Sequence, residues 1–207
     1  MPELSGDIPA DVTRFLVARG CAATAAHCRA VAEAAVALAT RFGVRADAAQ
    51  AAGWLHDVSA VVPVTGRVAV AEAWGLEVLP EEAALPMILH QKLSAWMAQH
   101  YFGISDPSVI GAIGCHTTLR AGATPLDMVV FVADKIAWDQ PGTPPYLAAL
   151  EAALHRSLVA GACVYLSYLW QHRADLPVVH PWLAQAYGEL CQSPLQPGAR
   201  VAAGDQV

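Results

Sequence analysis

Six histidine and aspartate side chains lie in or beside apolar stretches of this sequence: His27, His56, Asp57, His90, His116 and Asp134. A buried imidazole or carboxylate is costly in free energy unless it is hydrogen-bonded, paired or bound to a metal ion. Because the pattern places these groups on several separate helices, we interpret them as one site that forms on folding. Imidazole and carboxylate together are typical ligands of iron, manganese and zinc ions, whereas structural zinc sites usually include cysteine.

His56 and Asp57 are adjacent near the predicted end of a helix, so both side chains could point to one centre. Asp57 has two carboxylate oxygens with which to bridge two ions. Two ions about 3.5–4 Å apart can hold a phosphoryl group between them and produce hydroxide at neutral pH. The residues therefore predict a metal-dependent phosphohydrolase in which metal-bound hydroxide attacks phosphorus, with Asp57 as a catalytic residue.

Three cationic side chains lie near these ligands in the sequence. Lys92 and Lys135 are the only lysines of the chain, each within two residues of a proposed ligand, and Arg120 follows His116 by four residues. Ammonium and guanidinium groups suit phosphate oxygens. We expect all three to be catalytic and substrate-binding residues; solvent-exposed helix positions are an equally open interpretation for the lysines.

Three uncharged side chains complete the predicted substrate site. Thr117 and Thr118 follow a proposed ligand and could orient water or phosphate, although helix capping would explain them as well. Trp138 lies shortly after Asp134 and could stack on a nucleobase, with core packing as the alternative.

The spacing of apolar residues predicts helices throughout the chain. We expect an all-α fold with a core metal site, one domain over residues 1–192 and a flexible tail over residues 193–207. The expected helices are Asp11–Arg19, Thr24–Phe42, one from Asp47 to the His56-Asp57 pair, Arg67–Trp74, one opened by Pro86 and running to Tyr101, Pro107–His116, Pro125–Trp138, Tyr146–His172 and Pro181–Cys191.

Composition narrows the class of protein. Hydrophobic residues make up 56% of the 207 residues and charged residues 14%, which is typical of a compact globular chain. The formal net charge of −6 argues against a nucleic-acid surface, which is normally basic. We expect neither a signal peptide nor a membrane span. The five cysteines are odd in number and form no CxxC pair, so we expect reduced thiols and a cytoplasmic protein.

The ordered set of His and Asp residues resembles the HD-domain metal phosphohydrolases. More narrowly, four segments are similar to the symmetrical diadenosine tetraphosphate hydrolases of the YqeK type: Leu55-His-Asp57, Leu89-His90, Cys115-His-Thr-Thr118 with Arg120, and Val132-Ala-Asp134. The resemblance spans residues 24–136. It implies that His27, His56, Asp57 and Asp134 hold one metal ion and His90 and His116 a second, with Asp57 bridging. It also implies iron, or manganese or cobalt, as the one or two divalent ions.

The resemblance implies cleavage of diadenosine tetraphosphate into two ADP. Two positions depart from the family pattern, which commonly has Lys where this chain has Ala60 and Arg near Gln140. We therefore expect a small nucleotide substrate, with weaker activity on diadenosine tetraphosphate than a full family member would show. A mononucleotide, an alarmone or another small phosphoester are the alternatives, as is a metal-binding sensor without turnover. A homodimer is also open.

Overall fold

Eleven α-helices and three short 3-10 helices (η1–η3) account for the regular structure of the part of the chain described by the computed structural model, residues 4–192. No strand occurs in that range, so the all-α prediction is confirmed. The predicted tail over residues 193–207 lies outside the described residues. In the same range, none of the helices combines the length and the apolar character that crossing a membrane requires.

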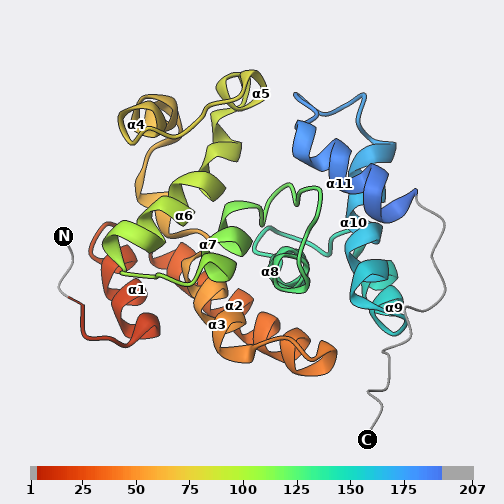
Figure 1. The fold of residues 1–207 in the computed structure, drawn as a ribbon, viewed down its shortest axis with the longest axis horizontal. Helices are drawn as coiled ribbons and strands as arrows, with labels where there is room; N and C mark the ends of the chain where they lie inside the picture. The colour runs from red at the N-terminus through yellow and green to blue at the C-terminus, as the bar shows by residue number, and fades with distance from the viewer. Residues whose placement is uncertain (1–3, 193–207) are drawn as a thin grey trace, which may run out of the picture.

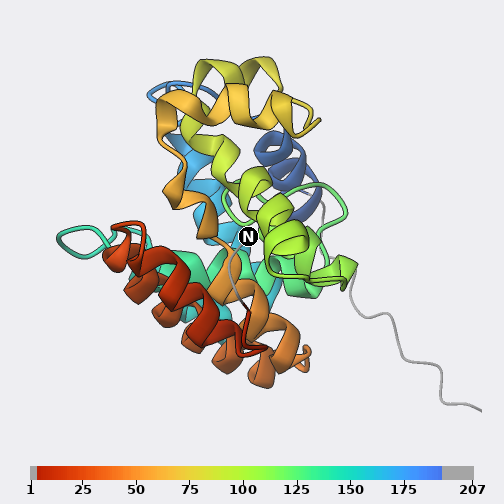
Figure 2. The same ribbon diagram turned by 90° about the vertical axis from the view of Figure 1, so that its left-hand side faces the viewer.

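The first half of the chain forms the helices α1–α7 and η1–η3 (Figure 1). These elements are α1 (Ile8–Val17), α2 (Ala22–Phe42), α3 (Ala46–Leu55), η1 (Val58–Val61), η2 (Val64–Gly66), α4 (Arg67–Ala73), α5 (Pro80–Ala84), η3 (Pro86–Leu89), α6 (His90–Tyr101) and α7 (Pro107–Gly114). In Figure 2, α4 and α5 lie at the top of the molecule and α1–α3 at the bottom.

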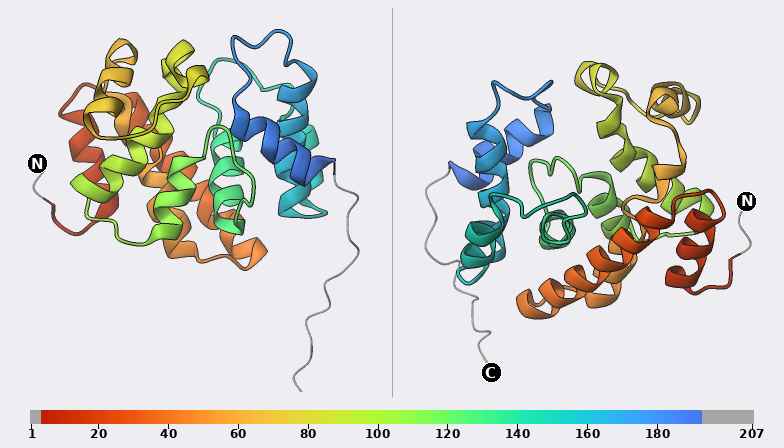
Figure 3. Two further views of the ribbon diagram at one scale, coloured as in Figure 1. Left: turned by 45° about the horizontal axis from the view of Figure 1, so that its top comes forward. Right: turned by 180° about the vertical axis from the view of Figure 1, so that it is seen from behind.

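The second half supplies the central helix and a helical group beside it. These elements are α8 (Pro125–Ile136), α9 (Leu147–Leu154), α10 (Leu158–Gln171) and α11 (Pro181–Cys191). Both views of Figure 3 show α9, α10 and α11 together at one end of the molecule, next to α8. Helix α8 packs on α2, α3, α7 and α10, so it is enclosed by its neighbours.

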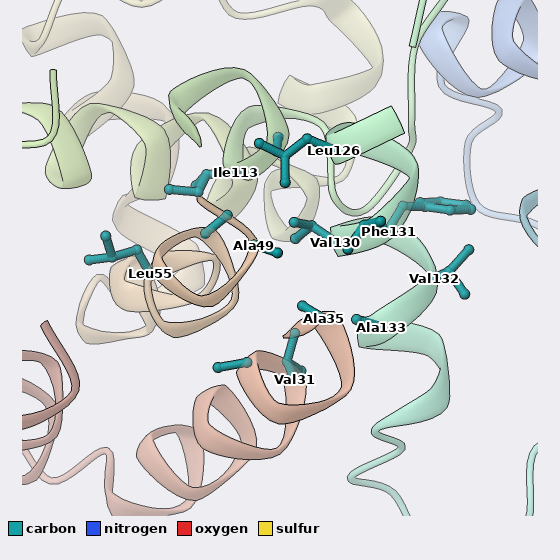
Figure 4. Packing of buried hydrophobic residues seen from close by; sticks show 14 of the residues in the cluster. Val31, Ala35, Ala49, Leu55, Ile113, Leu126, Val130, Phe131, Val132 and Ala133 are labelled. Atoms are coloured by element: carbon teal, nitrogen blue, oxygen red, sulfur yellow. The ribbon is translucent and has the colours of Figure 1, made fainter. Parts of the chain in front are cut away.

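The core forms where α2, α3, α7 and α8 meet (Figure 4). Val31 and Ala35 of α2 and Val130 of α8 are fully buried there. Gly53 sets the crossing of α2 and α3, because a Cβ at this position would lie 2.6 Å from the Cα of Ala32. Small residues therefore bring α2 and α3 into close contact, and this contact fixes the segment that follows α3.

The predicted long helix over Tyr146–His172 is wrong, because the structure divides it into α9 and α10. Ser157 caps α10 with its side chain, which accepts a hydrogen bond from the backbone N–H of Ala160. The two helices pack closely at Gly161, where a Cβ would lie 2.4 Å from Leu154 Cδ2. The apolar pattern continues through the break because both helices bury residues.

The prediction that all five cysteines are reduced thiols is also wrong. Cys163 of α10 and Cys191 at the end of α11 form a disulfide with a Cα–Cα distance of 5.5 Å. Cys21, Cys28 and Cys115 are free. The pair is 28 residues apart in sequence, and only the packing of α11 on α10 brings the two side chains together.

Candidate metal centre

Three packed helices bring four of the predicted ligands together. His27 lies in the second turn of α2, His56 and Asp57 directly follow α3, and Asp134 lies near the end of α8. Helix α3 ends at Leu55, so the His56-Asp57 pair lies in the turn before η1. Because α2, α3 and α8 pack on one another, their ligands approach from three sides.

The first cluster consists of His27, His56 and Asp134. His27 Nε2 lies 3.1 Å from Asp134 Oδ1, and His56 Nε2 lies 3.3 Å from His27 Nε2. His56 Nε2 is also 3.5 Å from Asp134 Oδ1. His56 is fully buried, so the cluster is closed off on the α3 side.

The second cluster consists of His90 and His116. His90 is the first residue of α6, and His116 lies in the turn just after α7. Their Nε2 atoms are 3.0 Å apart. Asp57 connects the two clusters: its Oδ1 lies 3.4 Å from His90 Nε2 and 3.5 Å from His116 Nε2, while its Oδ2 lies 3.7 Å from His56 Nε2.

The imidazole rings are oriented as metal ligands usually are. The Nδ1 atoms of His56, His90 and His116 each form a hydrogen bond with the backbone carbonyl three residues earlier, Gly53, Met87 and Ile113. A carbonyl only accepts hydrogen bonds, so each Nδ1 carries the proton and the Nε2 of a neutral ring has a free lone pair. Two such lone pairs facing each other at 3.0 Å repel unless a cation binds between them.

The charge states of the carboxylates and of the second cluster also suit a divalent ion. Burial opposes ionisation of Asp57, but the imidazoles of His56, His90 and His116 outweigh it and lower the pKa of this carboxyl. Burial lowers the pKa of His90 to about 4 and also lowers that of His116. At neutral pH the carboxylate is therefore charged and these two rings are neutral, which are the forms that bind metals. His27, His56 and Asp57, and likewise Asp57, His90 and His116, form groups that could hold a metal ion.

The structure brings three of the predicted substrate residues to the centre or next to it. Thr117 Oγ1 lies 2.9 Å from His90 Nε2. Thr118 is buried and bonds with Gln91, one residue after His90. Lys135 pairs with the Oδ2 atom of Asp134, and its ammonium group lies 5.2 Å from the centre of the Tyr165 ring.

The other predicted substrate residues are not brought to the ligands. Lys92 Nζ lies 2.7 Å from the buried carboxylate of Glu82. Arg120 donates two hydrogen bonds to Asp127 Oδ2, at 2.8 and 3.1 Å. Trp138 is 41% exposed, with its ring edge-on to Tyr146.

The sequence pattern missed two polar residues near the centre. Gln91 is buried, and its Oε1 accepts from the backbone N–H of Thr117 at 3.2 Å, which ties the residue after His90 to the residue after His116. A buried amide adjacent to a predicted ligand was the available signal. Arg67 donates from Nη1 to the Met87 carbonyl that also accepts from His90 Nδ1, and nothing in its local sequence indicates this contact.

Residues 24–139 match the family model of the HD domain. The chain belongs to the HD domain family. HD domains bind divalent metals, so the converging His and Asp side chains lie in a family for which a metal centre is expected. Membership supports a hydrolase.

Two curated relatives match about two thirds of this chain. An "uncharacterized protein in pepC 5'region" of Lactococcus lactis subsp. cremoris is 42% identical over 139 residues, which are 67% of this chain and 70% of the relative. The symmetrical bis(5'-nucleosyl)-tetraphosphatase of Bacillus subtilis is 28% identical over 137 residues, 64% of this chain and 72% of the relative.

A solved structure and a third relative extend the comparison. The crystal structure of a predicted HD superfamily hydrolase involved in NAD metabolism from Clostridium acetobutylicum has a TM-score of 0.80 at 22% identity, covering 88% of this chain and 96% of that chain. The two therefore share the fold. A probable nicotinate-nucleotide adenylyltransferase/Ap4A hydrolase of Mycoplasma genitalium is 32% identical over 110 residues, 53% of this chain and 31% of the relative.

Proposed function

We propose that this HD domain is a metal-dependent phosphohydrolase that cleaves a nucleotide, with diadenosine tetraphosphate to two ADP as the first candidate reaction. The observation that carries the proposal is the pair of ligand clusters that share Asp57, one oxygen toward each. The names of the Bacillus subtilis and Mycoplasma genitalium relatives support the dinucleoside substrate.

The cofactor in this proposal is one or two divalent transition-metal ions, with iron first and manganese or cobalt as alternatives. His27, His56, Asp57 and Asp134 would hold one ion and His90, His116 and Asp57 the other. Such ions supply Lewis acidity toward phosphoryl oxygens and lower the pKa of water toward neutrality. The overall reaction adds water across one P–O–P bond. The bridging oxygen stays on the phosphorus of one product, and the oxygen of water is added to the phosphorus of the other.

The protein's own side chains prepare the site for this reaction. The carbonyls of Gly53, Met87 and Ile113 hold three rings with Nε2 inward, so little reorganisation is needed when a ligand binds. The hydroxyl of Thr117 lies beside His90 and can donate to a phosphate oxygen. Lys135 holds Asp134 in place by an ion pair.

Other substrates and a non-catalytic role are the rival proposals. A mononucleotide, an alarmone or another small phosphoester would use the same centre, and Ala60 and Gln140 remove two cationic side chains that a long polyphosphate would favour. A metal-binding sensor is the rival from another class. Binding of a phosphorylated small molecule rather than nucleic acid, a homodimer and a cytoplasmic location remain predictions.

A substrate panel at equal metal occupancy tests the proposal. The protein would be reconstituted with Fe, Mn or Co, and diadenosine tetraphosphate, ATP, GTP, an alarmone and para-nitrophenyl phosphate would be compared by product analysis, with Asp57→Ala as the inactive control. We expect ADP from diadenosine tetraphosphate or hydrolysis of another nucleotide. Activity confined to esters without a nucleobase would contradict a nucleotide substrate. Metal-loaded protein that hydrolyses no member of the panel would favour the metal-binding sensor.

A further inference from the structure

Arg67 at the start of α4 is a buried cation in the described part of the chain. It is 8% exposed, as is Lys135, yet Lys135 is paired with Asp134. Lys92 and Arg120, which are more exposed than Arg67, also have a carboxylate within 2.8 Å. Within residues 4–192 Arg67 forms no ion pair. A buried guanidinium without an anion is costly in free energy.

The hydrogen bonds of Arg67 hold it beside the second ligand cluster. Its Nε donates to the Val62 carbonyl at 3.3 Å and its Nη1 to the Met87 carbonyl at 2.8 Å. The same Met87 oxygen accepts from His90 Nδ1, so one carbonyl joins Arg67 to a proposed metal ligand. Figures 1 and 2 show α4 alongside α6, the helix that His90 begins. No hydrogen bond to residues 4–192 uses Nη2.

Asp57 is the acidic group that acts on Arg67 electrostatically. Burial lowers the pKa of Arg67, and the Asp57 carboxylate acts in the opposite direction. A divalent ion bound by Asp57 would share that negative charge. The guanidinium would then lose part of the charge that compensates it among residues 4–192. A phosphate group has the negative charge and the oxygen geometry that a guanidinium fork recognises.

We propose that Arg67 is a substrate-binding residue that holds a phosphate group of the substrate at the His90 side of the metal centre. This inference rests on the proposed function, because it assigns a contact within the same site. Lys92 and Arg120 are paired with Glu82 and Asp127, so Arg67 would supply the cation that binds the phosphate. The guanidinium stays fixed by its two carbonyls and presents Nη2 to the anion.

Pyrophosphate binding to the metal-loaded protein tests the assignment without requiring turnover. Affinity would be measured by calorimetry for wild type, Arg67→Met, Arg67→Lys and the control Arg45→Met, whose exposed guanidinium pairs with Asp47 and Asp106. We expect affinity to fall about tenfold or more in Arg67→Met and by less in Arg67→Lys, because the charge remains but the fork is lost. Metal content measured by mass spectrometry should stay unchanged, and Arg45→Met should bind as wild type does.

Two results would overturn the assignment. Wild-type pyrophosphate affinity in both Arg67 variants would contradict the proposed contact between Arg67 and phosphate. If Arg67→Met does not fold, wild-type affinity and an unchanged KM in Arg67→Lys would contradict it as well. Loss of metal in step with loss of affinity would make Arg67 a positioning residue for His90 instead. If the protein binds pyrophosphate through Arg67 but hydrolyses no nucleotide, the proposed function is contradicted and the Arg67–phosphate contact still stands.

Discussion

The two ligand clusters that meet at Asp57 differ in how the chain builds them. His27 and Asp134 come from α2 and α8 and His56 directly follows α3, and these three helices pack on one another in the core. His90 and His116 come from the start of α6 and the turn after α7, and their neighbours Thr117 and Arg67 are polar. The first cluster is part of the core, whereas the second carries polar groups with which a substrate could bond.

This difference indicates that the two clusters have different roles. In the first cluster the Asp134 carboxylate forms an ion pair with Lys135. In the second cluster burial keeps His90 and His116 neutral, and Arg67 forms no ion pair with residues 4–192. We expect the first cluster to bind its ion as a structural part of the fold and the second to bind its ion together with the substrate phosphate.

Removing the shared carboxylate should have the largest effect. Asp57→Ala takes one oxygen from each cluster, so both ions should be lost and turnover should fall by about a thousandfold or more. Metal analysis and single-turnover assays measure this, with the exposed Asp47→Ala as the matched control. Two ions retained in Asp57→Ala would show that the clusters do not depend on a common carboxylate.

Removing one imidazole at a time separates the clusters. His116→Ala should deplete the ion of the second cluster and leave the other bound, whereas His56→Ala should deplete the first and lower the melting temperature, because it also opens a cavity in the core. Metal stoichiometry and thermal unfolding report the two effects. The exposed His172→Ala is the control, and identical losses in both variants would contradict two separate clusters.

The two lysines should behave differently when each is replaced by methionine. Lys135→Met leaves Asp134 without its cation, so metal affinity of the first cluster should change and the free energy of unfolding should fall by on the order of 3 kcal/mol. Lys92→Met breaks the pair with Glu82 and should destabilise the protein without changing metal content. Denaturant unfolding and metal titration measure both variants. A loss of metal in Lys92→Met would show that Lys92 supports the metal centre, contrary to this prediction.

The pH dependence of metal binding should be the smallest difference between the clusters. Burial opposes protonation of His56, but Asp57 and Asp134 outweigh it and raise its pKa well above the ordinary value. An ion must therefore displace a proton from His56 at pH 7, and affinity there should rise by about tenfold per pH unit. Because the pKa of His90 is about 4, affinity of the second cluster should be flat from about pH 6 to pH 8. Calorimetry of His116→Ala and His56→Ala in two buffers measures the protons released, and equal release would contradict the difference.

Sequence alone could select the six proposed ligands, because ionisable groups in apolar helical stretches are exceptional and need a partner. The expectation for Lys92 rested on its nearness to His90 in sequence. Two residues along a helix correspond to a rotation of roughly 200°, so the side chains point to nearly opposite sides. Lys92 therefore reaches Glu82, while His90 reaches the centre.

The all-α class and most helix positions were determined by the sequence, since apolar spacing, helix-capping residues and prolines act over a few residues. The break at Ser157, the Cys163–Cys191 disulfide and the position of Arg67 were decided by tertiary structure. Each depends on residues distant in the chain meeting across packed helices. Local spacing predicts which side chains need partners, but only the packing of α4, α6 and η3 decides that Arg67 and His90 share the carbonyl of Met87.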